Sequence, residues 1–156
     1  MHKENITAEI TERAFDFFYS FSRFEFSLKE NGYLKSNRPG VRAEPGWDTF
    51  VQDHSDKYSL SQSATALIEQ SPEQQIVLPG SELGWRPVNL EQHNNDLARV
   101  AHLLKTVRNN LFHGGKHGGA NWDNPARTMH LILLSKAILD ELAAIGDFEA
   151  DYKRIY

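Results

Sequence analysis

Residues 6–31, ITAEITERAFDFFYSFSRFEFSLKEN, carry the pattern that decides the fold. Apolar side chains recur here at steps of three and four residues, which is the period of an α-helix with one buried stripe. Asn5 or Thr7 can cap its start, and Asn31-Gly32 is a typical helix stop. The stripe consists of Ile6, Ile10, Ala14, Phe17, Phe18, Phe21, Phe24 and Leu28. The pattern therefore predicts one long helix.

The same stretch holds more aromatic side chains than a single stripe can use. They are Phe15, Phe17, Phe18, Tyr19, Phe21, Phe24 and Phe26. We expect this helix to be buried on two sides, by its own core and by a partner chain. This excess is one reason to predict a homodimer.

Four further helices are predicted downstream. Two short ones cover residues 47–58 and 60–70. A second long helix is expected to begin at Asn89, because Asn89 and Gln92 resemble a capping box, and to stop at Gly114-Gly115. The last begins near Asp123, with Pro125 in its first turn, and ends at Gly146.

The region between the first and second long helices is predicted to contain long loops. Residues 33–46 hold two prolines and two glycines, and residues 75–88 lack a helical period apart from a short extended piece at 76–78. We expect an all-α bundle of about five helices with a long central loop region, forming one domain over residues 1–156.

Composition narrows the class of protein. The chain is 40% hydrophobic and 24% charged, as in ordinary soluble globular proteins. It has no cysteine, which excludes disulfides, thiolate metal sites and a cysteine nucleophile and fits a cytoplasmic protein. No secretory signal or membrane span is expected, so no membrane partner is predicted. The net charge of −4 argues against a broad basic face, so any RNA contact should be local.

The chemistry-bearing stretch is residues 107–119, VRNNLFHGGKHGG. Arg108 and His113 lie five residues apart, which is about 500° around a helix and leaves their directions about 140° apart. They can converge if His113 occupies the last turn and the chain bends at Gly114, since glycine tolerates positive φ. The stretch therefore predicts an Arg–His pair at the end of a helix.

The two residue types suit RNA cleavage. Arginine offers a fixed fork of donors to a phosphate, and histidine exchanges protons near neutral pH. RNA supplies its own nucleophile, the 2′-hydroxyl, so neither a metal nor another cofactor is needed. The expected products carry a 2′,3′-cyclic phosphate and a 5′-hydroxyl. On spacing alone a structural role remains open, because an arginine near a helix end can simply interact with the last carbonyl groups.

Two stretches of the chain resemble HEPN domains. RNNLFH, residues 108–113, is similar to the Arg-x4–6-His signature of that family, including the asparagine after the arginine. FFYSFSRFEFSLKENGY, residues 17–33, resembles the aromatic opening helix of some bacterial members. The resemblance covers roughly residues 10–35 and 90–145, whereas residues 36–88 resemble nothing that we can name.

The resemblance implies a function and a set of site residues. It implies a homodimer whose two Arg–His pairs face one cleft, with Arg108 and His113 catalytic and Asn109 orienting them or the phosphate. It also implies a toxin or phage-defence effector held in check by an antitoxin or another regulatory protein. The alternatives are a non-catalytic dimer that binds a nucleotide or a protein, and a purely structural role for the segment.

Several other residues keep two interpretations each. Glu25 either orients Arg108 or belongs to a solvated edge with Lys29. Asn110, Lys116 and His117 either extend the RNA site or serve as ordinary structural and loop residues. The tryptophans Trp47, Trp85 and Trp122 either pack under loops or stack on a base. We expect no metal site, since no HExxH pattern is present and Gly114-Gly115 separates His113 from His117.

Overall fold

The first long helix forms where the sequence predicts it. The computed structural model describes residues 6–113 and 124–153. Helix α1 spans Ala8–Glu30, with Thr7 as its N-cap and Asn31 as its C-cap. The Thr7 hydroxyl accepts a hydrogen bond from Ile10 N at 3.2 Å. Its inner stripe is confirmed at Ile10, Phe17, Phe21, Phe24 and Leu28, which are buried. The prediction is wrong for Ile6, which precedes the helix, and for Phe18, since both are exposed, whereas Ala14 is half-buried.

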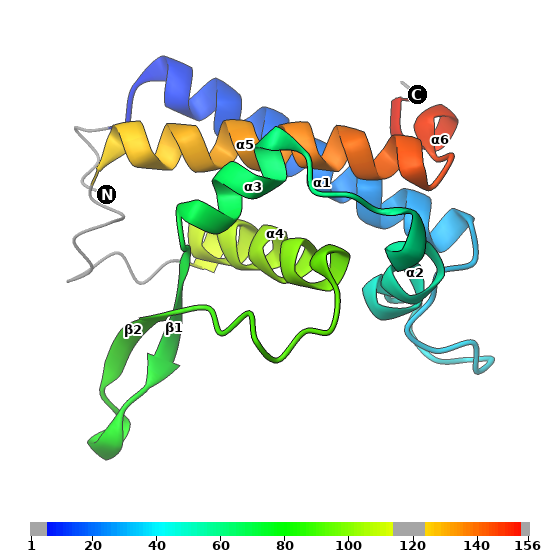
Figure 1. The fold of residues 1–156 in the computed structure, drawn as a ribbon, viewed down its shortest axis with the longest axis horizontal. Helices are drawn as coiled ribbons and strands as arrows, with labels where there is room; N and C mark the ends of the chain where they lie inside the picture. Colours follow the sequence, from blue (N-terminus) through cyan, green and yellow to red (C-terminus); the bar gives the residue numbers. More distant parts are fainter. Residues whose placement is uncertain (1–5, 114–123, 154–156) are drawn as a thin grey trace.

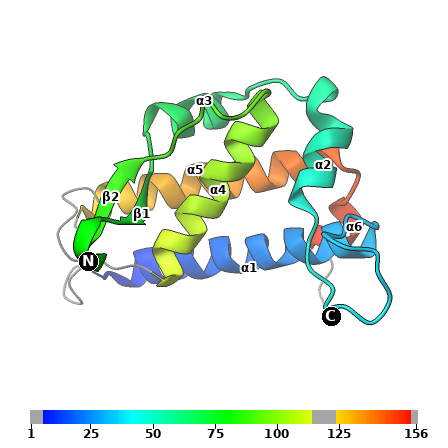
Figure 2. The same ribbon diagram turned by 90° about the horizontal axis from the view of Figure 1, so that it is seen from below.

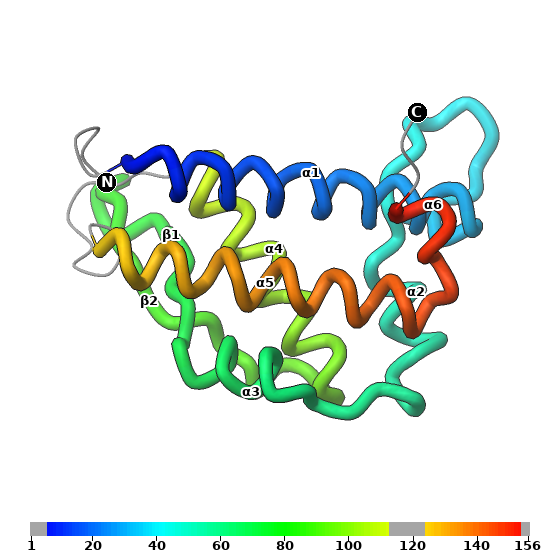
Figure 3. Tube along the Cα trace, turned by 90° about the horizontal axis from the view of Figure 1, so that it is seen from above, coloured from blue at the N-terminus to red at the C-terminus, as the bar shows by residue number. Residues whose placement is uncertain are grey.

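Three long helices enclose the core. Helices α1 and α5 (Pro125–Ile145) lie side by side and run in the same direction (Figure 3). Helix α4 (Asp96–His113) crosses obliquely beneath them, and its C-terminal end reaches the N-terminal half of α1 (Figure 2). The core side chains between them include Phe17, Phe24, Leu97, Leu104, Val107, Ile132 and Leu139.

Short helices pack against these three long ones. Helix α2 (Trp47–His54) continues into the 3-10 turn η2 (Ser55–Lys57), and α3 is Gln62–Glu69. Both lie within the ranges that the sequence predicts. A short helix that the sequence did not predict, α6 (Glu149–Lys153), packs on α1, where the Arg23 guanidinium donates to the Asp151 carbonyl.

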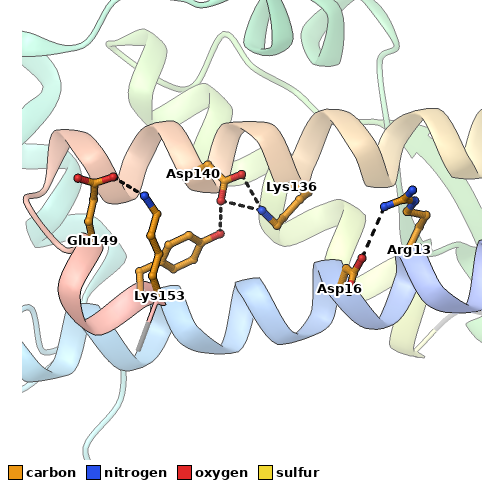
Figure 4. A network of polar contacts seen from close by, with 7 residues as sticks. Arg13, Asp16, Lys136, Asp140, Glu149 and Lys153 are labelled. Carbon is orange, nitrogen blue, oxygen red and sulfur yellow. Dashed lines mark hydrogen bonds and ion pairs between the residues drawn. The ribbon is translucent and has the colours of Figure 1, made fainter. Parts of the chain in front are cut away.

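Polar contacts run along the surface formed by α1, α5 and α6 (Figure 4). Lys136 and Asp140 of α5 form an ion pair at 2.6 Å, and Glu149 and Lys153 of α6 form another at 2.6 Å. The Tyr152 hydroxyl also donates to Asp140, at 2.8 Å. The Tyr152 hydrogen bond joins α6 to α5, whereas each ion pair lies within a single helix.

A β-hairpin corrects the prediction of an all-α protein. Strand β1 (Glu73–Val77) pairs antiparallel with β2 (Leu83–Pro87), and the 3-10 turn η3 (Pro79–Ser81) joins them. The hairpin projects away from the helices (Figure 1). Its strands are short and largely exposed, so they lack the strong alternation of apolar residues by which a half-buried strand is recognised. The prediction of a mainly helical protein is nevertheless confirmed.

The predicted start of the second long helix at Asn89 is wrong. Helix α4 begins at Asp96, and Asn95 Oδ1 caps it by accepting from Ala98 N at 2.8 Å. Asn89 Oδ1 instead accepts from Glu91 N at 3.0 Å, which is the local turn that asparagine favours outside helices. Two asparagines can each cap a helix, and the sequence indicated the wrong one. Among the described helices, none has the length and apolarity needed to cross a membrane.

Candidate functional site

The Arg–His segment lies in the last turns of α4. The structure describes α4 as far as His113. The expected bend at Gly114 lies outside the described residues, as do Lys116, His117, Trp122 and the side chain of His113. The structure therefore fixes the position of Arg108 and of the backbone that leads to His113.

Arg108 is held in place by two neighbours. Its Nη1 donates to Asn109 Oδ1 at 2.8 Å. Its Cζ lies 5.4 Å from the centroid of the Phe21 ring of α1, within the range of a cation–π contact. The side chain is half-buried. Neither contact uses a carboxylate, so the positive charge of Arg108 is not neutralised by these two partners.

A groove of about 490 Å³ opens beside Arg108. We call it the Arg108 groove; its walls include Glu25, Lys35, Arg42, Trp47, Lys105 and Arg108. It therefore brings together four cationic side chains, from α4 and from the loop that follows α1, and three carboxylates, those of Glu25, Glu44 and Asp48. Lys35 is partly neutralised, because its Nζ lies 3.1 Å from Glu44 Oε2. The cationic side chains in the wall of the groove thus outnumber the carboxylates only slightly.

Glu25 lies in the Arg108 groove but has a structural partner. Its Oε1 accepts a hydrogen bond from the Trp47 indole nitrogen at 3.0 Å. This bond satisfies the polar atom of a tryptophan that is only 5% exposed, and it ties α1 to the start of α2. That Glu25 also orients Arg108 stays a prediction.

Asn110 points away from Arg108 and anchors the hairpin. It is buried, and its Nδ2 donates to the Glu73 carbonyl oxygen at 2.6 Å. The neighbouring Asn109 is exposed and holds Arg108. The two adjacent asparagines thus have different roles in this structure, one within the fold and one beside the candidate phosphate site. An RNA contact by Asn110 stays a prediction.

Replacing Asn110 by alanine should lower the melting temperature by about 1–6 °C. The side-chain hydrogen bond contributes about 0.5–1.5 kcal/mol, and about 1 kcal/mol corresponds to 2–4 °C in a chain of this length. Thermal unfolding monitored by circular dichroism measures the shift. Asn109→Ala is the matched control, and we expect it to leave the melting temperature nearly unchanged. Equal shifts in the two variants would contradict the different roles.

A second and larger cavity, of about 750 Å³, lies between α2, α4 and the hairpin. We call it the Trp85 cavity; its walls include Trp85, Gln92, His93, His102, Lys105 and Asn109. Trp47, Asp48 and Lys105 line both this cavity and the Arg108 groove. The two hollows are therefore neighbours along α4.

Two histidines meet at the wall of the Trp85 cavity. His93 Nε2 lies 2.8 Å from His102 Nδ1, and Gln92 Nε2 lies 3.3 Å from the same His102 nitrogen. Burial lowers the pKa of His102, and the neighbouring His93 and Lys105 lower it further. Burial likewise lowers the pKa of His93, with Lys105 and Arg99 adding to the effect and Asp48 opposing it. Both rings are therefore neutral near pH 7.

Little in the amino-acid pattern indicated this cavity. His93 precedes α4 and meets His102 only because the loop after β2 folds back onto the helix. One usable signal was the spacing of His102, Lys105 and Asn109, since steps of three and four residues place side chains on one helix face. In the part of the chain that the structure describes, no three histidine or carboxylate side chains gather closely enough to hold a metal ion.

Comparison with known proteins identifies no relative of this chain. No protein-family model matches the chain, and neither a curated protein nor a solved structure matches it. The resemblance to HEPN domains therefore stays a prediction that rests on residues 108–113 and on the first helix.

Proposed function

We propose that this protein is a HEPN-type endoribonuclease that cuts RNA without a metal. The observation that carries the proposal is the position of Arg108. Its half-buried side chain lines a groove together with Lys35, Arg42 and Lys105, and Asn109 holds its guanidinium. It precedes His113 by five residues on the same helix. A phosphate in the Arg108 groove would meet a preorganised fork of donors near that helix end.

The proposed reaction uses only groups of the RNA and of the protein. The 2′-oxygen of one nucleotide attacks the adjacent phosphorus, and the bond from phosphorus to the 5′-oxygen breaks. The 2′-hydroxyl proton passes to a histidine that acts as base, and the 5′-oxygen leaves with a proton from an acid. Arg108 stabilises the negative charge that develops on the phosphate oxygens. The products are a 2′,3′-cyclic phosphate and a 5′-hydroxyl.

The helical path of α4 favours a site shared by two copies of the chain. Because α4 stays helical to His113, the directions of Arg108 and His113 from the helix axis differ by about 140°. One straight helix therefore does not aim both side chains at the same phosphate. In a two-fold dimer, Arg108 of one copy and His113 of a second copy can approach one phosphate, and two histidines are present to serve as base and acid.

An exposed apolar surface lies next to His113 and suits such a dimer. Phe112 is 45% exposed and packs on Phe18, which is 42% exposed, with their ring centroids 4.8 Å apart. Phe15, on the same surface, is 64% exposed. We call this surface the Phe112 patch; it consists of Ile6, Ile10, Ala14, Phe15, Phe18, Leu111 and Phe112. It includes Phe15 and Phe18, two of the aromatic residues of α1 for which the sequence predicted a partner, but not the exposed Tyr19.

The chain should therefore be a dimer in solution, with a mass near twice 17.8 kDa. Light scattering at micromolar concentration measures it. Phe15→Asp places a charge in the Phe112 patch and should shift the protein to monomer. Leu83→Asp is the matched control, because Leu83 is also 64% exposed but lies in the hairpin. A monomeric wild type, or the same shift in both variants, would count against the shared site.

The biological role that we propose is a toxin or phage-defence effector controlled by an antitoxin or another regulatory protein. It rests on the resemblance alone. Expression of the wild type should then arrest growth, whereas expression of His113→Ala should not. Growth arrest by both proteins would separate toxicity from RNA cleavage.

One observation favours a second candidate function, a non-catalytic dimer that binds a nucleotide or a protein. Arg108 is positioned by Asn109 and Phe21 and needs no histidine to anchor a phosphate. Cleavage of mixed RNA by purified protein in EDTA separates the two functions. Cleavage that depends on His113 supports the nuclease, whereas phosphate binding that persists in His113→Ala without any cleavage selects the binding module.

A further inference from the structure

The Trp85 cavity has the size and the wall of a small-ligand site. Its volume of about 750 Å³ falls in the range of pockets that bind small molecules, roughly 300–1,000 Å³. Two tryptophans, a histidine pair and several amide side chains line it, together with the charged side chains of Asp48 and Lys105. A ring face together with uncharged hydrogen-bonding groups suits a flat ligand that carries hydrogen-bond donors and acceptors along its edge.

Trp85 provides the ring face. It lies in β2, opposite Gln75, and both residues line the cavity. The side chain is half-buried against the core, so its ring is supported. The other tryptophan of the wall, Trp47, is only 5% exposed and has Lys105 Nζ 5.9 Å from its ring centroid. Trp85 is therefore the better surface for stacking a base.

The His93–His102 pair provides hydrogen-bonding groups for the edge of such a ligand. Two neutral imidazoles use one donor and one acceptor for their mutual contact, which leaves one donor and one acceptor on the two outer nitrogens. A nucleobase edge also offers donors and acceptors side by side. A phosphate offers only acceptors and is better matched by cations. The pair therefore suits a base rather than a second phosphate.

Lys105 and Asn109 connect this cavity to the candidate phosphate site. His102, Lys105 and Asn109 follow one another along α4 at steps of three and four residues, so they share one helix face. Lys105 lines both hollows, and Asn109, in the wall of the Trp85 cavity, accepts the hydrogen bond from Arg108. A phosphate near Arg108 and Lys105 thus has the Trp85 cavity beside it.

We infer that the Trp85 cavity holds the base of a nucleotide whose phosphate lies at Arg108 and Lys105. The base stacks on Trp85 and meets the His93–His102 pair with its polar edge, and the cavity thereby selects which nucleotide is presented for cleavage. The inference rests on the proposed function for its ligand, an RNA strand.

Binding of short RNA tests the inference without requiring cleavage. The experiment uses His113→Ala as the background, and measures the affinity for fluorescein-labelled RNA hexamers of each of the four bases in EDTA by anisotropy. Adding Trp85→Ala should weaken the tightest of these complexes by about 5–150-fold, the equivalent of about 1–3 kcal/mol for one stacked base. Trp85→Phe keeps a ring and should lose much less. Leu83→Ala, on the same strand but outside the cavity, should change nothing.

Separate readouts distinguish failure of the cavity from failure of the nuclease. If the wild type cuts RNA but Trp85→Ala binds the hexamers as tightly as its background, the cavity inference is overturned and the proposed function is not. If no cleavage occurs but binding depends on Trp85, the cavity inference is supported and the proposed reaction fails. Equal loss in Trp85→Ala and Leu83→Ala, with lowered melting temperatures, overturns the stacking role. Nucleoside monophosphates that bind as tightly as the hexamers would identify a free-nucleotide site and overturn the link to RNA.

Discussion

Replacing His113 by alanine is expected to lower the rate of RNA cleavage by about 10²–10⁴-fold. His113 is the proton-transferring group of the proposed site, and it lies in the last turn of α4, five residues after Arg108. The 2′-hydroxyl is a weak nucleophile until its proton is removed, and the 5′-oxygen is a poor leaving group until it gains one. Single-turnover cleavage of a labelled RNA by purified protein measures the effect.

A second histidine controls for non-specific effects of the substitution. His130 is exposed on α5, and His130→Ala should cut RNA at the wild-type rate. The melting temperatures of both variants should match that of the wild type. If His113→Ala cut RNA as fast as His130→Ala, the Arg–His pair would not be the catalytic site.

Replacing Arg108 by alanine is expected to lower kcat by about 10²–10³-fold, which is the usual cost of losing one donor that stabilises developing negative charge. Arg108→Lys should fall between the alanine variant and the wild type. Lysine keeps the charge beside the Arg108 groove, but it lacks the planar fork that binds two phosphate oxygens at once. Steady-state kinetics on one defined RNA gives kcat and KM separately for both variants.

Arg13 offers the matched control for the change of arginine to lysine. It is exposed on α1, where it lies 3.8 Å from Asp16, on the surface that Figure 4 shows. Arg13→Lys should leave kcat and KM unchanged. A kcat for Arg108→Lys equal to that of Arg13→Lys would show that only charge matters at residue 108, and the proposed forked phosphate contact would be wrong.

Local signals made the starts of α1 and α5 predictable to within about two residues. Helix α1 follows from its apolar period, and Thr7 caps it because a threonine hydroxyl can reach the free amide groups of the first turn. The start of α5 follows in the same way from Asn124, which caps it, and from Pro125 in its first turn. Signals of this kind act within three or four residues, so one sequence contains them completely.

Features that depend on distant contacts were not predictable. The hairpin forms because strand Glu73–Val77 pairs with strand Leu83–Pro87 across a turn. Asn110 of α4 also stabilises it by donating a hydrogen bond to the carbonyl oxygen of Glu73. The position of Asn110 within the fold could not be inferred from its place in RNNLFH. In an α-helix, consecutive residues differ in direction by about 100°, so two adjacent asparagines face different surroundings.

The candidate site likewise has one part that the sequence indicated and one part that it did not. The sequence indicated Arg108 and Asn109, and the structure places them in contact beside the Arg108 groove. The sequence did not indicate the Trp85 cavity, because α2, α4 and the hairpin must come together to form it. The residue types in the sequence therefore suggested the chemistry of the Arg–His pair. The wall of the Trp85 cavity, which we propose binds a base, could be recognised only from the folded structure.

The measurement that tests the central claim most directly is cleavage of matched RNA and DNA strands of one sequence in excess EDTA, with analysis of the product ends. The proposed mechanism predicts that purified wild-type protein cuts the RNA, leaves 2′,3′-cyclic phosphate and 5′-hydroxyl ends, and does not cut the DNA. Equal cleavage of both strands would contradict the role of the 2′-hydroxyl, and activity only after magnesium is restored would contradict the metal-independent mechanism.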